Sequence, residues 1–288
     1  MPEYYHNSSY LEYGGAPDKA VKNAFAYAID KYIRVHNKYN KNEQAFKQFL
    51  DKTNHLSEFF YYIILTTQKI DEMRINAAKA LAEINEEEPK EEDLKKIATE
   101  KLKKYIKLIL ELWLCRLVEC YENYLSSILK DVFLCCPDIL KSSETVKIDE
   151  ILKYDTMEDF VKELSEKKVS ELSYSSFDDL YNFFDKKLGI NIIDDEGRSL
   201  IREAIEIRNI STHNNCIINR RYISKLNLDE KLIGKRKDIT SKYLGDVIDI
   251  LYDNVQDIDS KLIKKFKIKN CKFIALGRIK SDEKVSGA

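Results

Sequence analysis

The chain is poor in residues that interrupt helices. Among its 288 residues there are only eight Gly and four Pro, whereas hydrophobic residues make up 44% and charged residues 34%. Glycine and proline are the least favourable residues in a helix interior, so their scarcity favours long helices over a multi-stranded sandwich. A chain of this length can bury one large core or two modest ones. We therefore predict an all-α, multi-helix bundle.

The chain also lacks a large excess of one charge. Lys and Arg number 48 against 49 Asp and Glu, which leaves a net charge of −1. A strongly basic nucleic-acid-binding chain is excluded by this total, so any basic surface must be local. Residues 261–280 hold eight basic residues and no acidic one. This run is typical either of contact with a nucleic-acid backbone or of a lysine-protected sheet edge. Residues 266–269 alternate with period two, and we expect them to pair with 271–276 as a hairpin across Asn270.

Signals for a metal, a cofactor or a membrane span are missing as well. The six cysteines form no C-x-x-C pair and no histidine cluster accompanies them, so we expect no metal site and no cofactor. No signal peptide is evident, so we expect reduced thiols and a cytoplasmic location. The apolar runs at 59–65 and 105–121 are too short or too interrupted by charge to cross a bilayer. No membrane partner is expected.

The pattern of breakers divides the chain into four parts. We expect a loose arm at 1–15, an N-terminal helical segment at 16–88, a helical domain at 94–255 and a basic element with a tail at 256–288. The acidic stretch around Pro89 marks the first boundary, since proline cannot continue a helix interior. Helical spacing predicts the helices themselves, which begin near Pro17 and Glu43 and then span about 56–84, 94–134 and 239–255.

Several helix ends and core residues are specific enough to predict. Thr156 with Asp159, and Ser176 with Asp179, have the spacing of capped helix starts, and Gly189 is expected to end the helix that Ser176 begins. Trp113 and the tyrosines at helical spacing around it are expected in the core rather than on a base-stacking surface.

The stretch from Ile207 to Asn215 contains the side chains best suited to phosphate binding and proton transfer. Arg208 supplies a permanent cation with a planar donor fork suited to phosphate, and His213 can exchange protons near neutral pH. On an ideal helix five positions amount to about 140°, so Arg208 and His213 would point to different sides, whereas Asn209 and His213 share a face. Either the helix ends before His213, or the site takes residues from two chains. Asn214 and Asn215 tolerate turn conformations, which favours a helix end near 213.

Residues on either side of this stretch have two interpretations each. Arg220, Arg221 and Tyr222, expected on the loop that follows, could grip an RNA backbone and stack a base, or could simply cover the next helix. Glu203 and Glu206 could tune the histidine, but solvated charges on a helix face are the commoner arrangement. From spacing alone, Arg208 and His213 could also be a surface arginine and a capping histidine.

The motif resembles the signature of the HEPN superfamily. The resemblance lies in Arg208-Asn209-xxx-His213-Asn214-Asn215 and the Cys216–Tyr222 stretch after it, and it extends to similar segments at Glu119–Leu125 and Phe183–Gly189. It covers roughly residues 100–225. HEPN domains are all-helical nucleotide-binding and ribonuclease domains, and the ribonucleases among them are homodimers in which both motifs line one cleft. Position 215 is Asn, where HEPN toxins silenced by modification carry a tyrosine, so this chain departs from that pattern.

The resemblance implies metal-independent RNA cleavage. A ribose 2′-OH would attack the adjacent phosphate, with His213 as general acid or base, Arg208 holding the phosphate, and Asn209 and Asn214 in support. It also implies a homodimer and a role in prokaryotic defence or a toxin–antitoxin pair, with an antitoxin or regulatory protein as a further partner. A catalytically silent HEPN module that binds nucleotide or a partner is the alternative, and a helical scaffold with an accidental motif is a third.

Overall fold

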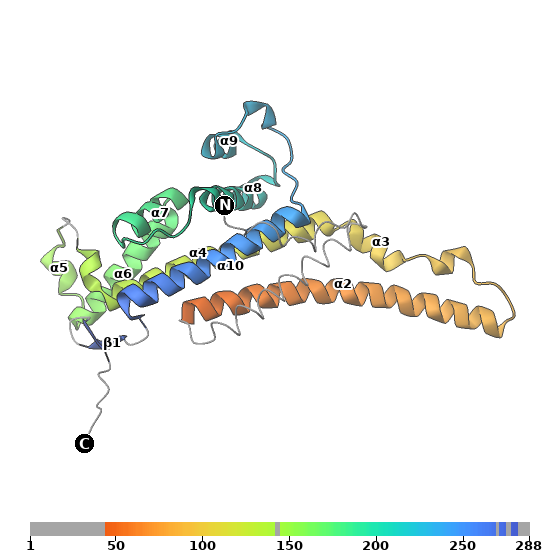
Figure 1. The fold of residues 1–288 in the computed structure, drawn as a ribbon, viewed down its shortest axis with the longest axis horizontal. Coiled ribbons are helices and arrows are strands. Elements are labelled where there is room, and N and C mark those ends of the chain that lie inside the picture. The colour runs from red at the N-terminus through yellow and green to blue at the C-terminus, as the bar shows by residue number, and fades with distance from the viewer. Residues whose placement is uncertain (1–43, 142–144, 269–270, 275–277, 282–288) are drawn as a thin grey trace, which may run out of the picture. The chain divides into compact units, whose positions relative to one another are not determined.

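The computed structural model describes residues 44–141, 145–268, 271–274 and 278–281, and these are mostly helical, which confirms the all-α prediction (Figure 1). The predicted arm at 1–15 and the helix from Pro17 lie outside the described residues. The α-helices are α2 (Gln44–Ile84), α3 (Ile97–Lys103), α4 (Ile106–Cys135), α5 (Ile148–Ile151), α6 (Met157–Tyr174), α7 (Phe177–Lys186), α8 (Asp195–Asn214), α9 (Arg220–Leu226) and α10 (Ser241–Phe266). Short 3-10 turns are η2 (Glu91–Leu94), η3 (Pro137–Leu140) and η4 (Glu230–Leu232), and a hairpin joins β1 (Cys271–Ile274) to β2 (Arg278–Ser281).

The chain divides into two compact units. Of the described residues, the first unit comprises Asp51–Val118 and Glu203–Asp249. The second comprises 44–50, Glu119–Arg202 and the residues from Ile250 onward. Helices α2, α4, α8 and α10 each contribute residues to both units. The boundary that the sequence places after residue 255 therefore falls inside α10.

Helix α2 is a single helix of 41 residues, so the prediction of separate helices from Glu43 and from Leu56 is wrong. The apolar pattern in the sequence breaks off at this point because the inward face of the helix is polar here. Thr53, Asn54 and Ser57 are all buried. The Ser57 hydroxyl donates to the Thr53 carbonyl at 2.9 Å, one turn back. Such a bond satisfies a buried hydroxyl inside a helix, so no break is needed.

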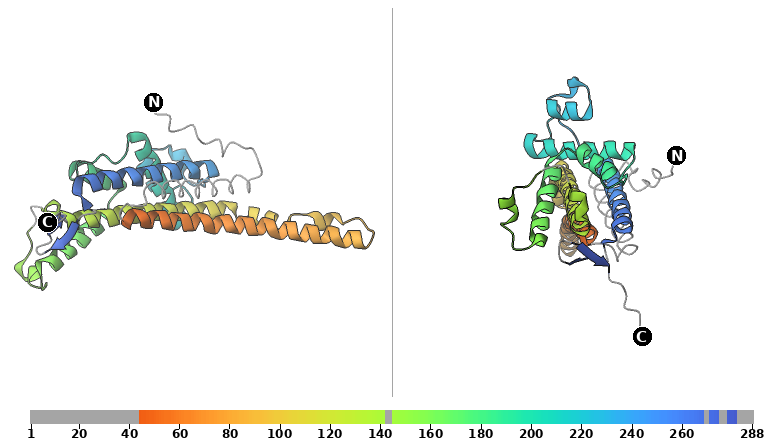
Figure 2. Two further views of the ribbon diagram at one scale, coloured as in Figure 1. Left: turned by 60° about the horizontal axis from the view of Figure 1, so that its bottom comes forward. Right: turned by 90° about the vertical axis from the view of Figure 1, so that its left-hand side faces the viewer.

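The predicted helix over 94–134 is interrupted near its start. Helix α3 ends at Lys103, and α4 begins at Ile106 after a turn in which Tyr105 N–H donates to the Leu102 carbonyl at 2.9 Å. Helix α3 lies beside α2 within the first unit (Figures 1 and 2). The Asp71 carboxylate of α2 accepts from the backbone N–H groups of Ala98 and Thr99, at 2.9 and 2.7 Å. This tertiary contact fixes the start of α3, and local spacing gives no sign of it.

Aromatic residues of α4 lie in the core, as predicted. Trp113, Tyr121 and Tyr124 are no more than 2% exposed. In the second unit the Tyr121 hydroxyl donates to Asn254 Oδ1 at 2.7 Å, and the Asn254 amide nitrogen donates to the Ile192 carbonyl. The buried amide of α10 therefore connects α4 to the segment that precedes α8.

The predicted helix starts of the second unit are confirmed. The Thr156 side chain accepts from Asp159 N–H at the start of α6, and Ser176 forms a full capping box with Asp179 at the start of α7. After α7, Gly189 has a φ of 58°, which glycine adopts without steric strain. Helix α4 ends at Cys135, directly before Cys136 and Pro137, because a proline cannot continue a helix interior.

The C-terminal part differs from the prediction. Helix α10 continues to Phe266, beyond the expected end at 255. Strand β1 lies within the predicted segment, but its antiparallel partner is Arg278–Ser281 rather than residues 266–269. Period-two alternation at 266–269 is too short to distinguish a strand from the last turn of a helix, and α10 takes Phe266.

Candidate functional site

Helix α8 carries the whole motif without interruption. It runs from Asp195 through Asn214 and ends where Asn215 and Cys216 take left-handed φ angles of 50° and 59°. The Asn214 amide nitrogen donates to the Ile217 carbonyl at 2.6 Å and closes the turn. The helix therefore ends just after His213 rather than before it, so Arg208 and His213 are separated by about 140° around one helix.

His213 lies on the solvent side of the last turn of α8. Its side chain is exposed, and it forms no hydrogen bond or ion pair with another described residue. The Asn209 amide nitrogen, one turn earlier, donates to Glu206 Oε2 at 3.3 Å. Asn209 is thus held by a residue of its own helix rather than by the imidazole, which leaves the imidazole available to a ligand.

Arg208 lies on a different side of α8, where the helix meets α4 within the first unit. It is half-buried, and its charge acts on the Cys115 thiol of α4. Burial raises the pKa of Cys115, while hydrogen bonding from Ser211 and the positive charge of Arg208 partly oppose that shift. Burial also raises the pKa of the Cys216 thiol, which shares the Ser211 hydroxyl. Both thiols are free, and the pKa shifts keep them protonated.

A short backbone stem follows the motif. Ile218 N–H donates to the Lys235 carbonyl at 2.9 Å, and the Ile218 carbonyl accepts from Gly234 N–H. The Cys216 carbonyl accepts from Lys237 N–H at 2.8 Å. We call residues 215–237, which these bonds close into a loop with α9 and η4 inside, the α9 segment. The stem fixes where the α9 segment leaves and rejoins the rest of the first unit (Figure 1).

Arg236 connects the stem to the end of α8 and to α4. Its guanidinium donates to the Asn215 carbonyl at 2.9 Å and forms an ion pair with Glu111 of α4. The bond and the charge of Glu111 raise the pKa of Arg236 further. The end of the motif helix is therefore anchored to α4 by a charged residue that follows the motif by more than twenty positions.

The α9 segment is a local basic surface in a chain with almost no net charge. It contains seven basic residues and two acidic ones. Lys231, Arg236 and Lys237 have acidic partners. Four others are exposed and have no ion pair with a described residue: Arg220, Arg221, Lys225 and Lys235. Arg220 and Arg221 form the first turn of α9 rather than a loop, because the Asn219 side chain caps that helix by accepting from Tyr222 N–H.

Tyr222 is 1% exposed, so its ring covers the interior rather than offering a stacking surface. Burial raises its pKa, and the negative charges of Glu203 and Glu206 raise it further. Burial is also the main cause of the raised pKa of Tyr243, and the negative charge of Glu203 raises it further. Glu203 itself forms an ion pair of 2.7 Å with Lys237. We call Glu203, Tyr222, Lys237 and Tyr243 the Glu203 cluster.

Glu206 is only 8% exposed, so its interpretation as a solvated charge on the helix face is wrong. For Glu203 that interpretation is incomplete, because its carboxylate forms an ion pair with Lys237. Glu111, Cys115 and Arg236 were missed altogether. They come from parts of the sequence that no local motif connects, and the Arg236–Glu111 contact spans 125 positions.

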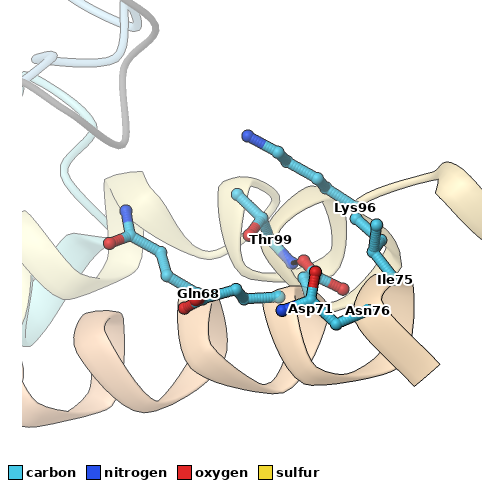
Figure 3. Close-up of a pocket in the computed structure, with 7 residues that line it drawn as sticks. Gln68, Asp71, Ile75, Asn76, Lys96 and Thr99 are labelled. Atoms are coloured by element: carbon cyan, nitrogen blue, oxygen red, sulfur yellow. Dashed lines mark hydrogen bonds between the residues drawn. The ribbon is translucent and has the colours of Figure 1, made fainter. Parts of the chain in front are cut away.

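A separate pocket of about 410 Å³ opens between α2 and α3. Figure 3 shows Asp71 pointing toward Thr99 across it, with Gln68 and Lys96 at its edges. None of its lining residues belongs to the motif, and Asp71 is already used to fix α3. We assign this pocket to helix packing.

Other kinds of site were searched for over the described part of the chain. It contains no group of three or more His, Cys, Asp or Glu side chains placed to hold a metal ion. None of its helices combines the length and the apolar character needed to cross a bilayer. Comparisons of the chain with protein-family models, with curated proteins and with solved structures found no match.

Proposed function

We propose that the protein is a metal-independent endoribonuclease in which His213 exchanges the protons of the reaction and Arg208 holds the scissile phosphate. The observation that carries this proposal is the exposed His213, followed directly by a segment with four exposed basic residues that form no ion pair with a described residue. An imidazole that forms no hydrogen bond or ion pair with the described part of the chain is available as a general acid or base. Exposed Arg and Lys side chains hold an RNA backbone without reading its sequence.

The separation of Arg208 and His213 around α8 adds a requirement. One chain does not place both side chains on one helix face, so the proposal includes a homodimer in which Arg208 of one copy serves His213 of the other. The HEPN resemblance supports the same arrangement. A defence or toxin–antitoxin role, an antitoxin or regulatory partner and a cytoplasmic location rest on the resemblance and the composition alone.

The chemistry requires no group that the chain lacks. The 2′-OH loses its proton to a base and attacks phosphorus, and the 5′-oxygen leaves with a proton from an acid, which yields a cyclic phosphate. Arg208 stabilises the charge that builds up on the phosphoryl oxygens during attack. His213 of each copy can serve one of the two proton transfers.

Purified protein incubated with total RNA in the presence of a chelator tests the proposal. We expect cleavage that falls by about 10²–10⁴-fold in His213→Ala, because general acid–base groups contribute that much. His55→Ala, which removes an exposed histidine of α2, is the matched control and should cleave normally. Undiminished cleavage by His213→Ala contradicts the mechanism.

Substitution of Arg220, Arg221, Lys225 and Lys235 by Ala separates binding from chemistry. We expect weaker RNA binding, and a slope of log affinity against log salt that is shallower by about three, since each lost phosphate contact removes about 0.7 for single strands. RNA that is bound but not cleaved by the unaltered protein indicates instead a silent nucleotide-binding module. The wide angular separation of Arg208 and His213 on a single chain favours that second function.

A further inference from the structure

A second set of basic side chains lies outside the α9 segment. Residues 95–107, which include α3 and the start of α4, hold six lysines and one acidic residue. We call these residues the lysine run. Four of its lysines are exposed and form no ion pair with a described residue: Lys95, Lys96, Lys101 and Lys104. The lysine run therefore presents an excess of positive charge, which attracts a phosphate backbone without reading its sequence.

Tyr105 lies near the end of the lysine run with its side chain in solvent. It is 58% exposed, whereas Tyr121 and Tyr124 of α4 are buried. Its backbone is held on both sides, because Tyr105 N–H donates to the Leu102 carbonyl of α3 and the Tyr105 carbonyl accepts from Ile109 N–H of α4, both at 2.9 Å. A ring on a fixed backbone loses little conformational freedom when another ring stacks on it.

Apolar side chains lead from Tyr105 toward the motif. Leu108 and Leu112 follow on α4 and are 50% and 52% exposed. We call Tyr105, Leu108 and Leu112 the α4 strip. Positions 105, 108, 112 and 115 fall within an arc of about 80° on one helix, and ten residues of rise separate the first from the last by roughly 15 Å. The charge of Arg208 acts on the Cys115 thiol, so the α4 strip points along the helix to the place where Arg208 lies.

The α9 segment borders the same part of α4. Lys107 Nζ forms an ion pair of 2.9 Å with Asp238, the residue that follows the α9 segment, and Arg236 pairs with Glu111. Lys107, Glu111 and Cys115 are four residues apart, so they share one side of α4, next to the α4 strip. All of these residues belong to the first unit. The α4 strip therefore has the α9 segment along one side and the lysine run at its outer end.

We propose that the α4 strip and the lysine run bind single-stranded RNA, with a base stacked on the Tyr105 ring and the backbone held by Lys101 and Lys104. The proposal rests on the proposed function, because it extends the path of the same RNA beyond Arg208. Positive charge beside an exposed aromatic ring is the combination by which proteins hold single strands. The bases of a duplex already stack on one another, so Tyr105 selects unpaired RNA. The lysines favour RNA over a protein partner, since lysine is depleted in interfaces between proteins.

Binding is measured apart from cleavage. The full chain carrying His213→Ala is mixed with a fluorescein-labelled oligouridylate in the presence of a chelator, and fluorescence anisotropy gives the dissociation constant. Addition of Tyr105→Ala should raise that constant about 10-fold, because one stacked base is lost. The constant for the same strand annealed to oligoadenylate should not change. Tyr105→Phe should bind as tightly as the parent, since the ring rather than the hydroxyl stacks. Tyr62→Ala, which removes a 62% exposed tyrosine of α2, is the matched control and should bind normally.

Tyr105→Trp reports stacking directly. The chain has one tryptophan, Trp113, which is 1% exposed, so a tryptophan at position 105 would be the only one in solvent. Its emission should fall as the oligouridylate is added, whereas emission from the parent with Tyr105 should stay constant. Urea unfolding of the variants at position 105 should match the parent, because the substituted side chain is exposed.

The lysines are tested through salt. Lys101→Ala/Lys104→Ala should make the slope of log affinity against log salt shallower by about 1.4, since each lost phosphate contact removes about 0.7 for single strands. Lys153→Ala/Lys167→Ala removes two exposed lysines of the second unit and should leave the slope unchanged. An equal change of slope in both double variants would show that only total charge matters and would contradict a site at the lysine run.

Undiminished affinity of Tyr105→Ala for the single strand overturns the proposal, and so does Tyr105→Trp emission that RNA does not change. Either result would leave the α4 strip to a protein partner, while the proposed function stands if the unaltered protein cleaves RNA. Binding that depends on Tyr105 in a protein that cleaves no RNA has the opposite meaning, because it supports the single-strand site and contradicts the endoribonuclease. Absence of RNA binding at roughly 100 μM protein contradicts both.

Discussion

Two groups of polar side chains, one in each unit, bury polar atoms whose hydrogen bonding differs. In the second unit, the Asn254 amide uses both its oxygen and its nitrogen, on Tyr121 and on Ile192. In the Glu203 cluster of the first unit, the Tyr243 hydroxyl is buried with no hydrogen-bond partner among the described residues. Fully satisfied buried groups hold a fold rigid, whereas a group that lacks a partner lowers stability. The less satisfied cluster lies beneath the segment that we propose binds RNA.

Removal of the Asn254 amide should have the largest effect. Asn254→Ala leaves the Tyr121 hydroxyl and the Ile192 carbonyl buried without their partner, and each such loss costs about 1–3 kcal/mol. We expect the free energy of unfolding to fall by about 3 kcal/mol, measured by urea unfolding with fluorescence detection. Asn209→Ala is the matched control, because that amide is half-buried and makes one long bond to Glu206. An equal loss in both variants would remove the distinction between the two groups.

A smaller loss of stability is expected when Asp71 is replaced. Its carboxylate on α2 accepts hydrogen bonds from the start of α3. Burial alone would raise its pKa, but hydrogen bonds from the backbone of Thr99 and Ala98 outweigh it, and the pKa lies below its ordinary value. A lowered pKa in the folded state means that the stabilisation is present above the unfolded pKa near 3.8 and is lost as the pH falls through the folded pKa. Asp71→Asn should therefore be less stable than the unaltered protein at pH 6, by about 1 kcal/mol.

The difference at Asp71 should shrink as the pH falls below about 4, because the unaltered carboxylate then takes up its proton. Unfolding in urea at several pH values measures it. A difference that stays constant down to pH 2.5 would show that charge is not what Asp71 contributes.

The smallest effects contrast two tyrosines. Tyr121→Phe removes the donor to Asn254 and should lower the free energy of unfolding by about 1 kcal/mol. Tyr243→Phe removes a hydroxyl that has no hydrogen-bond partner among the described residues, so we expect a change within about 0.5 kcal/mol of zero. Thermal unfolding of both variants measures the contrast. A large loss at Tyr243 would reveal a bound water or ligand at that hydroxyl.

The sequence predicted features that depend on neighbouring residues. The caps at Thr156 and Ser176 and the burial of Trp113 follow from local spacing, and the structure confirms them. The single helix α2 was not predicted because Thr53, Asn54 and Ser57 look like surface residues until tertiary packing buries them.

The site was predictable only in part, for the same reason. The sequence identified Arg208 and His213 and the angle between them, since both lie on one helix. It did not identify Glu111 or Arg236, whose ion pair connects distant parts of the chain.

The stem that closes the α9 segment has a consequence for engineering and for evolution. Because Cys216 and Ile218 pair with Lys237, Lys235 and Gly234, the segment leaves and rejoins the fold at nearly one point. An insert that replaced residues 219–233 could use the same stem, provided that it also supplied buried side chains in the places of Tyr222 and Ile223. The surface that the α9 segment presents could thereby change, by evolution or by design, while helix α8 is retained.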